Sequence, residues 1–476
     1  MPVQVIVLYA VVQIAYLCCL GISIWFYTRP VDLVDADEIR QVAQETTRLP
    51  SATPEVIVLY PVLDELEATM RTAMIGFSRA EYPGARRVIA IPNADDAETI
   101  SSLHRIQQDH AFLEVLEIPP TDDDRWAAVW KAWDVNPKAY WWHTGKRNHE
   151  QGLPPKKTRQ LVYAFYTLAA DHPEALLSYI DADSVIPPDY FLAAAAGVRS
   201  YDVIQLDNVA GNGMKSFAAS MFAMDHMQWD GAMYQHMSAH GKHPFYVLGK
   251  GLFFRVSDLI KFGGFNPWVT IEDPEVGMRL WTNGCRLGIV RSPLIEEVPE
   301  TFSEGIRQRK RWVAGFLQSA GAPLTLMGMP FRKRFRARLN LVPCISLALN
   351  PIGLGVGIAV LVAAFVDGGR IISLPLEYLS FVTIGLTVVV MARGQLAAWR
   401  QTALFLHTRR ERLSFMARVN PLNLLVYWLW WSIPLAIGFW MFLADRGLRW
   451  ERTLKVDANH DLVRETVEVE REDSVA

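Results

Sequence analysis

The chain has 476 residues, of which 51% are hydrophobic and 20% are charged, and its mean hydropathy is positive at +0.12. A composition this apolar is unusual for a soluble protein of that length, so we expect membrane-spanning segments. The net charge of −3, without a basic block that carries interleaved aromatic residues, argues against nucleic acid as a partner.

The first predicted element is a membrane-spanning helix at residues 3–27, which are almost all apolar. At about 1.5 Å per residue this run is long enough to cross a hydrocarbon core of about 30 Å. A cleaved signal peptide is the alternative, but the run lacks a basic start and a small-residue cleavage site. The first base, Arg29, follows the span and favours an outside N-terminus with a cytoplasmic continuation.

Strands and helices alternate after a polar linker. Continuous apolar runs predict strands within 55–65 and 86–93, and helices are predicted over 66–78 and after the capping residues Asp95 and Asp96. Strand–helix alternation of this kind predicts a doubly wound sheet with parallel strands.

A further buried strand ends abruptly at Asp181-Ala182-Asp183. Ligands of open α/β sheets bind at the carboxyl ends of strands, and two carboxylates there can reach one hard divalent cation. Taken alone the pair is a weak signal, because most such pairs are solvated turns or caps. The helix predicted over 156–170 has bases in its first turn, which indicates either an anion nearby or a solvated helix end.

Two later stretches also carry chemistry-bearing residues. Glu272 and Asp273 precede an amphipathic helix, where they are either N-terminal caps or a base held at a defined position. A helix over 304–318 places Gln308, Arg311 and Trp312 on one face, because they are spaced i, i+3 and i+4.

The composition changes after residue 331. A basic segment at 331–338 suits anionic lipid headgroups, and three apolar runs of near-spanning length follow at 339–366, 374–392 and 422–443. The residues between the last two, 393–418, predict an amphipathic helix in the membrane interface. With an outside N-terminus, one span before the sheet domain and three after it would put the C-terminal tail outside. The basic residues after the last span favour the inside instead, and both placements stay open.

Together these stretches resemble the family 2 glycosyltransferases, in particular the membrane-embedded branch that includes cellulose, hyaluronan and chitin-oligosaccharide synthases. Four motifs carry the resemblance, which runs from about Glu55 to Gln318: LYPVLDE, the DAD at 181–183, the ED at 272–273 and the QRKRW at 308–312.

The resemblance implies an α/β fold with a GT-A-like, doubly wound mixed sheet, joined to transmembrane helices. The expected domains follow the chain in order: a transmembrane helix at 3–27, a linker at 28–54, the GT-A-like domain at 55–320, an interfacial basic segment at 321–338, three transmembrane helices within 339–445 with an amphipathic interfacial helix near 393–418, and a tail at 446–476.

The resemblance also implies roles for single residues. Asp64 or Glu65 would hold the nucleoside, and Asn93 or Asp95 would replace the aspartate that the family usually offers to the base. Lys157 and Arg159 would bind the diphosphate or base, and Asp181 and Asp183 the nucleotide and a Mg²⁺ or Mn²⁺ ion. Asp273 resembles the catalytic base with Glu272 beside it, and Gln308, Arg311 and Trp312 resemble the motif at the diphosphate and acceptor.

These roles describe an inverting, metal-dependent transfer from a UDP- or GDP-type sugar donor. Processive β-polysaccharide synthesis on a glycan acceptor is favoured, and transfer of one sugar to a membrane glycolipid or polyprenyl lipid is the alternative. Three later spans are few to enclose a polymer unless the chain forms a homo-oligomer. A non-catalytic membrane scaffold and a nucleotidyltransferase are remote alternatives. We expect an integral protein of the plasma (inner) membrane, in contact with its lipids, with the catalytic domain in the cytoplasm.

Overall fold

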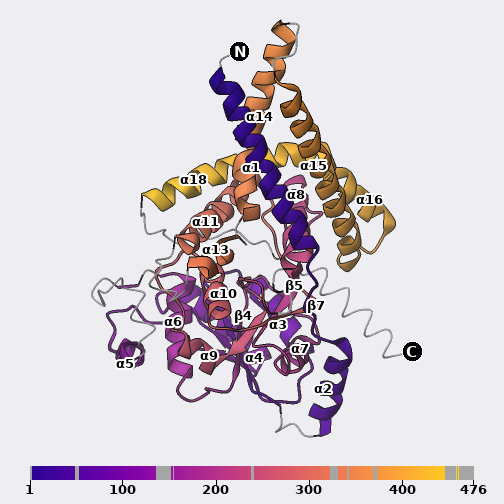
Figure 1. Cartoon of the computed structure of the whole chain (residues 1–476). Helices are drawn as coiled ribbons and strands as arrows, with labels where there is room; N and C mark the ends of the chain where they lie inside the picture. The colour runs from indigo at the N-terminus through magenta and orange to yellow at the C-terminus, as the bar shows by residue number, and fades with distance from the viewer. Residues whose placement is uncertain are drawn as a thin grey trace.

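The computed structural model describes residues 3–48, 53–135, 152–153, 155–236, 238, 241–321, 331–339, 342–367, 372–444, 457 and 459. Of the predicted segments, most of the tail at 446–476 and part of the interfacial segment at 321–338 lie outside these residues. Figure 1 shows a sheet domain at one end of the molecule and a group of long helices at the other.

A seven-stranded sheet forms the centre of the sheet domain, in the order β3-β2-β1-β4-β6-β5-β7. Its strands are β1 Val56–Tyr60, β2 Arg86–Ala90, β3 Leu113–Val115, β4 Leu176–Tyr179, β5 Val203–Ala210, β6 Leu252–Arg255 and β7 Leu287–Glu296. β6 runs antiparallel to β4 and β5, and the other pairs are parallel. The doubly wound mixed sheet that the resemblance implies is therefore confirmed, whereas the parallel strands predicted from strand–helix alternation alone are interrupted by the antiparallel β6.

Helices cover both faces of this sheet, which is why its strands are continuously apolar. On one face Ile57 and Leu59 of β1 pack with α6 Lys157–Leu168, α9 Val256–Lys261 and α10 Asp273–Thr282. On the other face Val56 and Val58 pack with α3 Glu67–Arg79, α4 Ala97–Asp109 and α7 Tyr190–Gly197. Both clusters bury these side chains almost completely. The strands, and with them the carboxyl edge of the sheet, are therefore held firmly in place by packing on both faces.

Five further helices lie around the sheet or at its boundary with the long helices. They are α2 Ala36–Arg48, α5 Ala127–Val135, α8 Phe217–Gln228 with a π-helical turn at Trp229–Met233, α11 Phe302–Ala320 and α13 Phe331–Leu339. The predicted cap at Asp96 is confirmed, because its carboxylate accepts a hydrogen bond from the Thr99 backbone N–H at the start of α4.

Three helices in the described part of the chain are long and apolar enough to cross a membrane: Val3–Tyr27, Leu374–Leu404 and Pro421–Leu443. They correspond to α1 Val3–Tyr27, to α15 Leu374–Gln401 with its following turn, and to α17 Pro421–Trp430 with α18 Ser432–Leu443. α14 Val342–Asp367, which the sequence predicts as another span, contributes a shorter apolar run at Pro351–Val366.

The segment 393–418, predicted as one amphipathic helix, is divided in the structure. α15 continues past residue 392 to Gln401, and a separate helix, α16 Arg409–Arg418, begins at a capping box formed by Thr408 and Glu411. The basic residues of 393–401 therefore extend the same helix that holds the apolar run.

The long helices pack directly on the sheet domain. α11 lies along α18, α8 packs against α15 and α16, and α1 packs with α14 and α15. Figure 1 shows α11 and α8 at the boundary between the two groups of elements. The helix that carries Gln308 to Trp312 is thus in contact with a helix that is long and apolar enough to span a membrane.

Candidate active site

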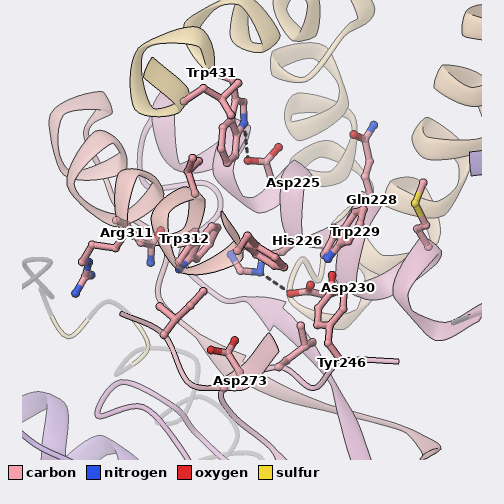
Figure 2. A pocket seen from close by; sticks show the side chains of 18 of the residues that line it. Asp225, His226, Gln228, Trp229, Asp230, Tyr246, Asp273, Arg311, Trp312 and Trp431 are labelled. Atoms are coloured by element: carbon pink, nitrogen blue, oxygen red, sulfur yellow. Dashed lines mark hydrogen bonds and ion pairs between the residues drawn. The ribbon is translucent and has the colours of Figure 1, made fainter. Parts of the chain in front are cut away.

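One cavity of about 1060 Å³ joins the carboxyl edge of the sheet to the spanning helices. From the sheet domain it is lined by Glu65, Lys157, Asp181, Asp183, Glu272, Asp273, Gln308, Arg311 and Trp312, all of which the sequence predicts as site residues. From the helices it is lined by apolar and small side chains such as Leu20, Ile352, Met391, Leu435 and Phe439. Figure 2 shows part of this cavity, with Asp273 below Trp312.

Lys157 connects the two acidic motifs. Its Nζ donates to Asp181 Oδ1 at 2.8 Å and to the Gly249 carbonyl at 3.0 Å, and it lies 3.2 Å from Glu272 Oε1. Burial alone would lower the pKa of Lys157, but Asp181, Glu272 and Asp273 outweigh it and raise the pKa above its ordinary value. The ammonium therefore stays charged at the point where the two motifs meet.

Asp273 begins α10, is partly buried and lines the cavity. Burial, followed by the neighbouring charge of Glu272, raises the pKa of Asp273 to about 8, although Lys157 opposes the shift. A carboxylate with a raised pKa is a stronger base than one in water, which suits it to accept a proton near neutral pH.

The two aspartates of the DAD motif have different environments. Asp181 is 43% exposed at its side chain, whereas Asp183 is 3% exposed and its Oδ2 accepts a hydrogen bond from the Glu297 backbone N–H at 2.8 Å. Carboxylate oxygens are the ligands that Mg²⁺ and Mn²⁺ prefer, so the chemistry of this donor set fits a divalent cation shared with phosphate oxygens.

Four predicted site residues lie beside the cavity rather than on its described lining. Asn93 Oδ1 accepts a hydrogen bond from Arg159 Nη2 at 2.6 Å, and burial lowers the pKa of Arg159 although Asp95 opposes this. Asp64, at a φ of 51°, donates its backbone N–H to Asp96 Oδ2 at 2.6 Å. Asp64 follows β1, the neighbour of β4, while Asn93 and Asp95 follow β2, the next strand out, and Arg159 lies in the first turn of α6.

The spacing of Gln308, Arg311 and Trp312 places all three toward the cavity. Arg309, on another face of α11, is fully buried and donates from Nη2 to Asp225 Oδ2 at 2.9 Å. Figure 2 shows Asp225 next to Trp431, whose Nε1 donates to the same oxygen at 3.3 Å. Within the QRKRW motif, Arg309 therefore does not line the cavity but pairs with Asp225 of α8.

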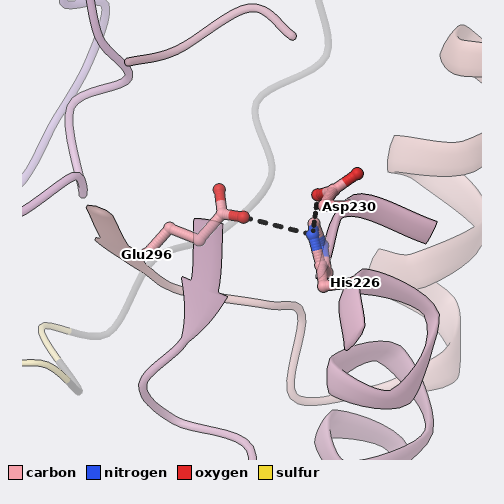
Figure 3. Close-up of side chains that lie close together, drawn as sticks. All are labelled: His226, Asp230 and Glu296. Atoms are coloured by element: carbon pink, nitrogen blue, oxygen red, sulfur yellow. Dashed lines mark hydrogen bonds and ion pairs between the residues drawn. The ribbon is translucent and has the colours of Figure 1, made fainter. Parts of the chain in front are cut away.

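Sequence reasoning missed a second polar cluster on the cavity wall, formed by His226, Asp230, Glu296 and Lys250. His226 Nδ1 lies 2.9 Å from Asp230 Oδ2 and 3.2 Å from Glu296 Oε1, as Figure 3 shows, and Lys250 pairs with Glu296. The sequence carries only weak signals of this cluster. They are the i, i+4 spacing of His226 and Asp230 and the glycines on both sides of Lys250, and only the fold brings these residues together.

The chain is similar to known glycosyltransferases in sequence and in structure. The family model described as "Glycosyl transferase family group 2" matches residues 176–443, more than half of the 476 residues. A probable glycosyltransferase of Sulfolobus acidocaldarius is 24% identical over 273 residues, which are 55% of this chain and 56% of that protein. The chain therefore spans little more than half the length of this relative.

Among solved structures, the mannosyltransferase PcManGT of Pyrobaculum calidifontis, in complex with GDP-Man and Mn²⁺, has a TM-score of 0.51 at 14% identity. The likeness covers 92% of this chain and 99% of that chain, and it shows a shared fold. Glucosyl-3-phosphoglycerate synthase of Mycobacterium tuberculosis is more distant, with a TM-score of 0.34 at 12% identity over 64% of this chain and 89% of that one.

Proposed function

Because the chain belongs to glycosyl transferase family group 2, we propose that it moves a sugar from a nucleoside diphosphate donor to a hydroxyl of a membrane-bound acceptor, with inversion. The observation that carries this proposal is the single cavity whose walls include both the acidic motifs and the apolar helices. A donor in water and an acceptor in a bilayer would meet in such a space.

The donor's diphosphate fits the positive and metal-binding groups at the sheet edge. Lys157, which pairs with Asp181, and Arg311 both line the cavity, and an arginine can hold a phosphate through two hydrogen bonds. A Mg²⁺ or Mn²⁺ ion held by the two aspartates would neutralise charge that develops on the leaving diphosphate. The Mn²⁺ and GDP-Man of PcManGT support a divalent cation and a nucleoside diphosphate sugar as the donor.

Asp273 would act as the base, because burial and the neighbouring charge of Glu272 keep the pKa of the Asp273 carboxyl high. The acceptor hydroxyl gives its proton to the Asp273 carboxylate while its oxygen forms a bond to the anomeric carbon of the donor sugar. The bond from that carbon to the diphosphate oxygen breaks on the opposite face, and the nucleoside diphosphate leaves with the electron pair. One displacement inverts the anomeric configuration.

The apolar half of the cavity favours an acceptor with a lipid part. Leu20, Ile352, Met391 and Phe439 offer hydrocarbon contacts, and several exposed apolar side chains of the spanning helices would face the bilayer. This wall suits one sugar added to a glycolipid or polyprenyl lipid, which enters between the spans.

Processive synthesis of a β-polysaccharide is the second candidate. Its support is Trp312 on the cavity wall, because an aromatic ring is a suitable surface for the apolar face of a sugar, and because QRKRW resembles the motif of chain-extending enzymes. A homo-oligomer would then supply the additional helices needed to enclose a polymer.

We place the protein in the plasma (inner) membrane with the sheet domain in the cytoplasm, where nucleotide sugars are made. The many arginines of α13 and α16 support this side, since basic segments favour the cytoplasmic face.

The test is turnover of a panel of nucleotide sugars by the purified protein in lipid nanodiscs with Mg²⁺ or Mn²⁺. We expect nucleoside diphosphate release with one donor, and one added sugar on an extractable lipid; a ladder of long products would favour the polymerase instead. Release of pyrophosphate would identify a nucleotidyltransferase. Asp273→Asn should abolish transfer and leave binding of the nucleoside diphosphate intact, and loss of that binding would contradict the assignment of Asp273 as the base.

A further inference from the structure

The cluster of His226, Asp230, Glu296 and Lys250 has no place in the donor site described above. All four residues line the same cavity, and they come from α8, the π-helical turn, the end of β7 and the loop before β6. His226 also contacts Trp312, with ring centroids 6.1 Å apart and ring planes at 83°. Figure 2 shows His226 between Trp312 and Asp230.

Glu296 has an acceptor atom that the described residues do not satisfy. The residue is 4% exposed, and its Oε1 receives no hydrogen bond from any described group, although it lies 3.2 Å from His226 Nδ1. Burial lowers the pKa of His226, so the neutral ring carries one N–H, and Nδ1 lies closer to Asp230 than to Glu296. A buried carboxylate oxygen without a donor is unfavourable, so a ligand that donates there would be bound favourably.

The chemistry of the cluster favours hydroxyl groups over a metal ion. Lys250 already neutralises Glu296 by an ion pair, and a cation bound to Glu296 would have to lie next to that ammonium. A sugar is instead bound by carboxylate acceptors and an ammonium donor placed around an aromatic ring. The aromatic ring packs on the apolar face of the sugar, and the charged groups form hydrogen bonds with the sugar hydroxyls.

We propose that Glu296, Asp230 and Lys250 bind the ring hydroxyls of a sugar on the acceptor, with Trp312 and His226 against that sugar. The acceptor is then a glycolipid or a glycan end, rather than a lipid alcohol without a sugar. The proposal rests on the proposed function and deepens it by naming the chemical class of the acceptor headgroup.

The test measures binding in lipid nanodiscs by calorimetry, with Mn²⁺ and UDP or GDP present, and it does not depend on turnover. The probes are hexyl β-glucoside and hexyl β-mannoside, with 1-hexanol as the probe that has the same apolar chain and no sugar. We expect the wild type to bind one of the glycosides at least about tenfold more tightly than hexanol, and Glu296→Gln and Asp230→Asn to remove that difference. The affinity for UDP or GDP should stay within about twofold, which also shows that the variants are folded.

Asp207→Asn is the matched control. Burial raises the pKa of Asp207 to about 7, its Oδ1 accepts from Gln235, and it lies near Asp230 without lining the described cavity. This variant should bind the glycosides as the wild type does.

Three results would overturn the inference. One is equal binding of the glycosides and hexanol by the wild type, and another is unchanged glycoside binding in both cluster variants. The third concerns Mn²⁺. If the Asp181→Asn/Asp183→Asn protein still binds a Mn²⁺ ion, and adding Glu296→Gln abolishes that binding, the cluster is a metal site. If neither UDP nor GDP binds to the wild type, the proposed function itself fails, and the inference fails with it.

Discussion

The fully buried Arg309 of α11 and the partly buried Asp225 of α8 form an ion pair, with 2.9 Å between Nη2 and Oδ2. The same oxygen accepts hydrogen bonds from Tyr427 and Trp431 of the last spanning segment, and the Arg309 guanidinium lies 5.2 Å from the Trp312 ring centroid. One carboxylate therefore joins α8, the motif helix α11 and the last candidate spanning segment, and its partner Arg309 lies beside the Trp312 ring.

Arg309→Gln should destabilise the protein and reduce transfer. The substitution leaves the Asp225 carboxylate without its cation, and because this side chain is 22% exposed the loss should fall below the roughly 3–5 kcal/mol of a fully buried pair. Thermal unfolding in nanodiscs and donor turnover measure the two effects. Arg307→Gln, on an exposed part of the same helix, should change neither, and equal losses in both variants would contradict a specific role of the pair.

Lys157→Met should weaken donor binding by at least about tenfold and slow transfer further. The variant removes the positive charge that lies between Asp181 and Glu272 and that would face the diphosphate. Calorimetry with UDP and GDP measures the affinity. Lys156→Met is the matched control on the same turn, since Lys156 is buried but does not line the described cavity; equal affinity in both variants would argue against a phosphate role for Lys157.

Removal of divalent cations should abolish transfer, and Asp183→Asn should reduce it by roughly 100-fold, about 2.7 kcal/mol in the barrier. The reason is that the leaving diphosphate loses the ion that neutralises it. Activity after chelation and on readdition of Mg²⁺ or Mn²⁺ measures this. Asp171→Asn, an exposed carboxylate beyond α6, is the control. Full activity in the presence of excess chelator would exclude the ion.

The pH dependence should show a rising limb controlled by Asp273. Only the ionised carboxylate accepts a proton, so a pKa of about 8 predicts that kcat/KM falls as pH decreases below that value. Lys157→Met should move the limb to higher pH, because a nearby positive charge lowers the pKa of Asp273. A profile that stays flat from about pH 6 to 9 would show that ionisation of this base does not limit the reaction.

Gly438→Val should separate α18 from α11. A Cβ at Gly438 would lie 2.7 Å from both the Lys310 carbonyl oxygen and Val313 Cβ, so the two helices cannot keep their present distance. We expect a lower unfolding temperature and slower transfer to a membrane acceptor. Gly385→Val on α15 is the control, because a Cβ there has no neighbour within 4 Å. An unfolding temperature equal to that of the control would show that the contact is not needed.

The local features of the chain were predictable from its sequence. Continuous apolar runs predicted β1, β2 and β4, and the spacing of Gln308, Arg311 and Trp312 predicted their common face, because a strand and a helix have fixed periods. The same reasoning could not place Asp64, Asn93, Asp95 and Arg159 relative to the cavity, since side chains after different strands meet only in the folded sheet. It also could not show that Arg309 points to Asp225, because that partner lies 84 residues earlier.

The sequence by itself determined the alternation of strands and helices in an α/β domain, the apolar helices of spanning length and the order of the acidic motifs along the chain. Only the tertiary structure decided that Lys157 contacts both acidic motifs, that His226, Asp230 and Glu296 form one cluster, and that the cavity continues between the membrane helices. The physical reason is that periodicity and capping act within a few residues, whereas a cavity and a charge cluster depend on distances between elements that are remote in sequence.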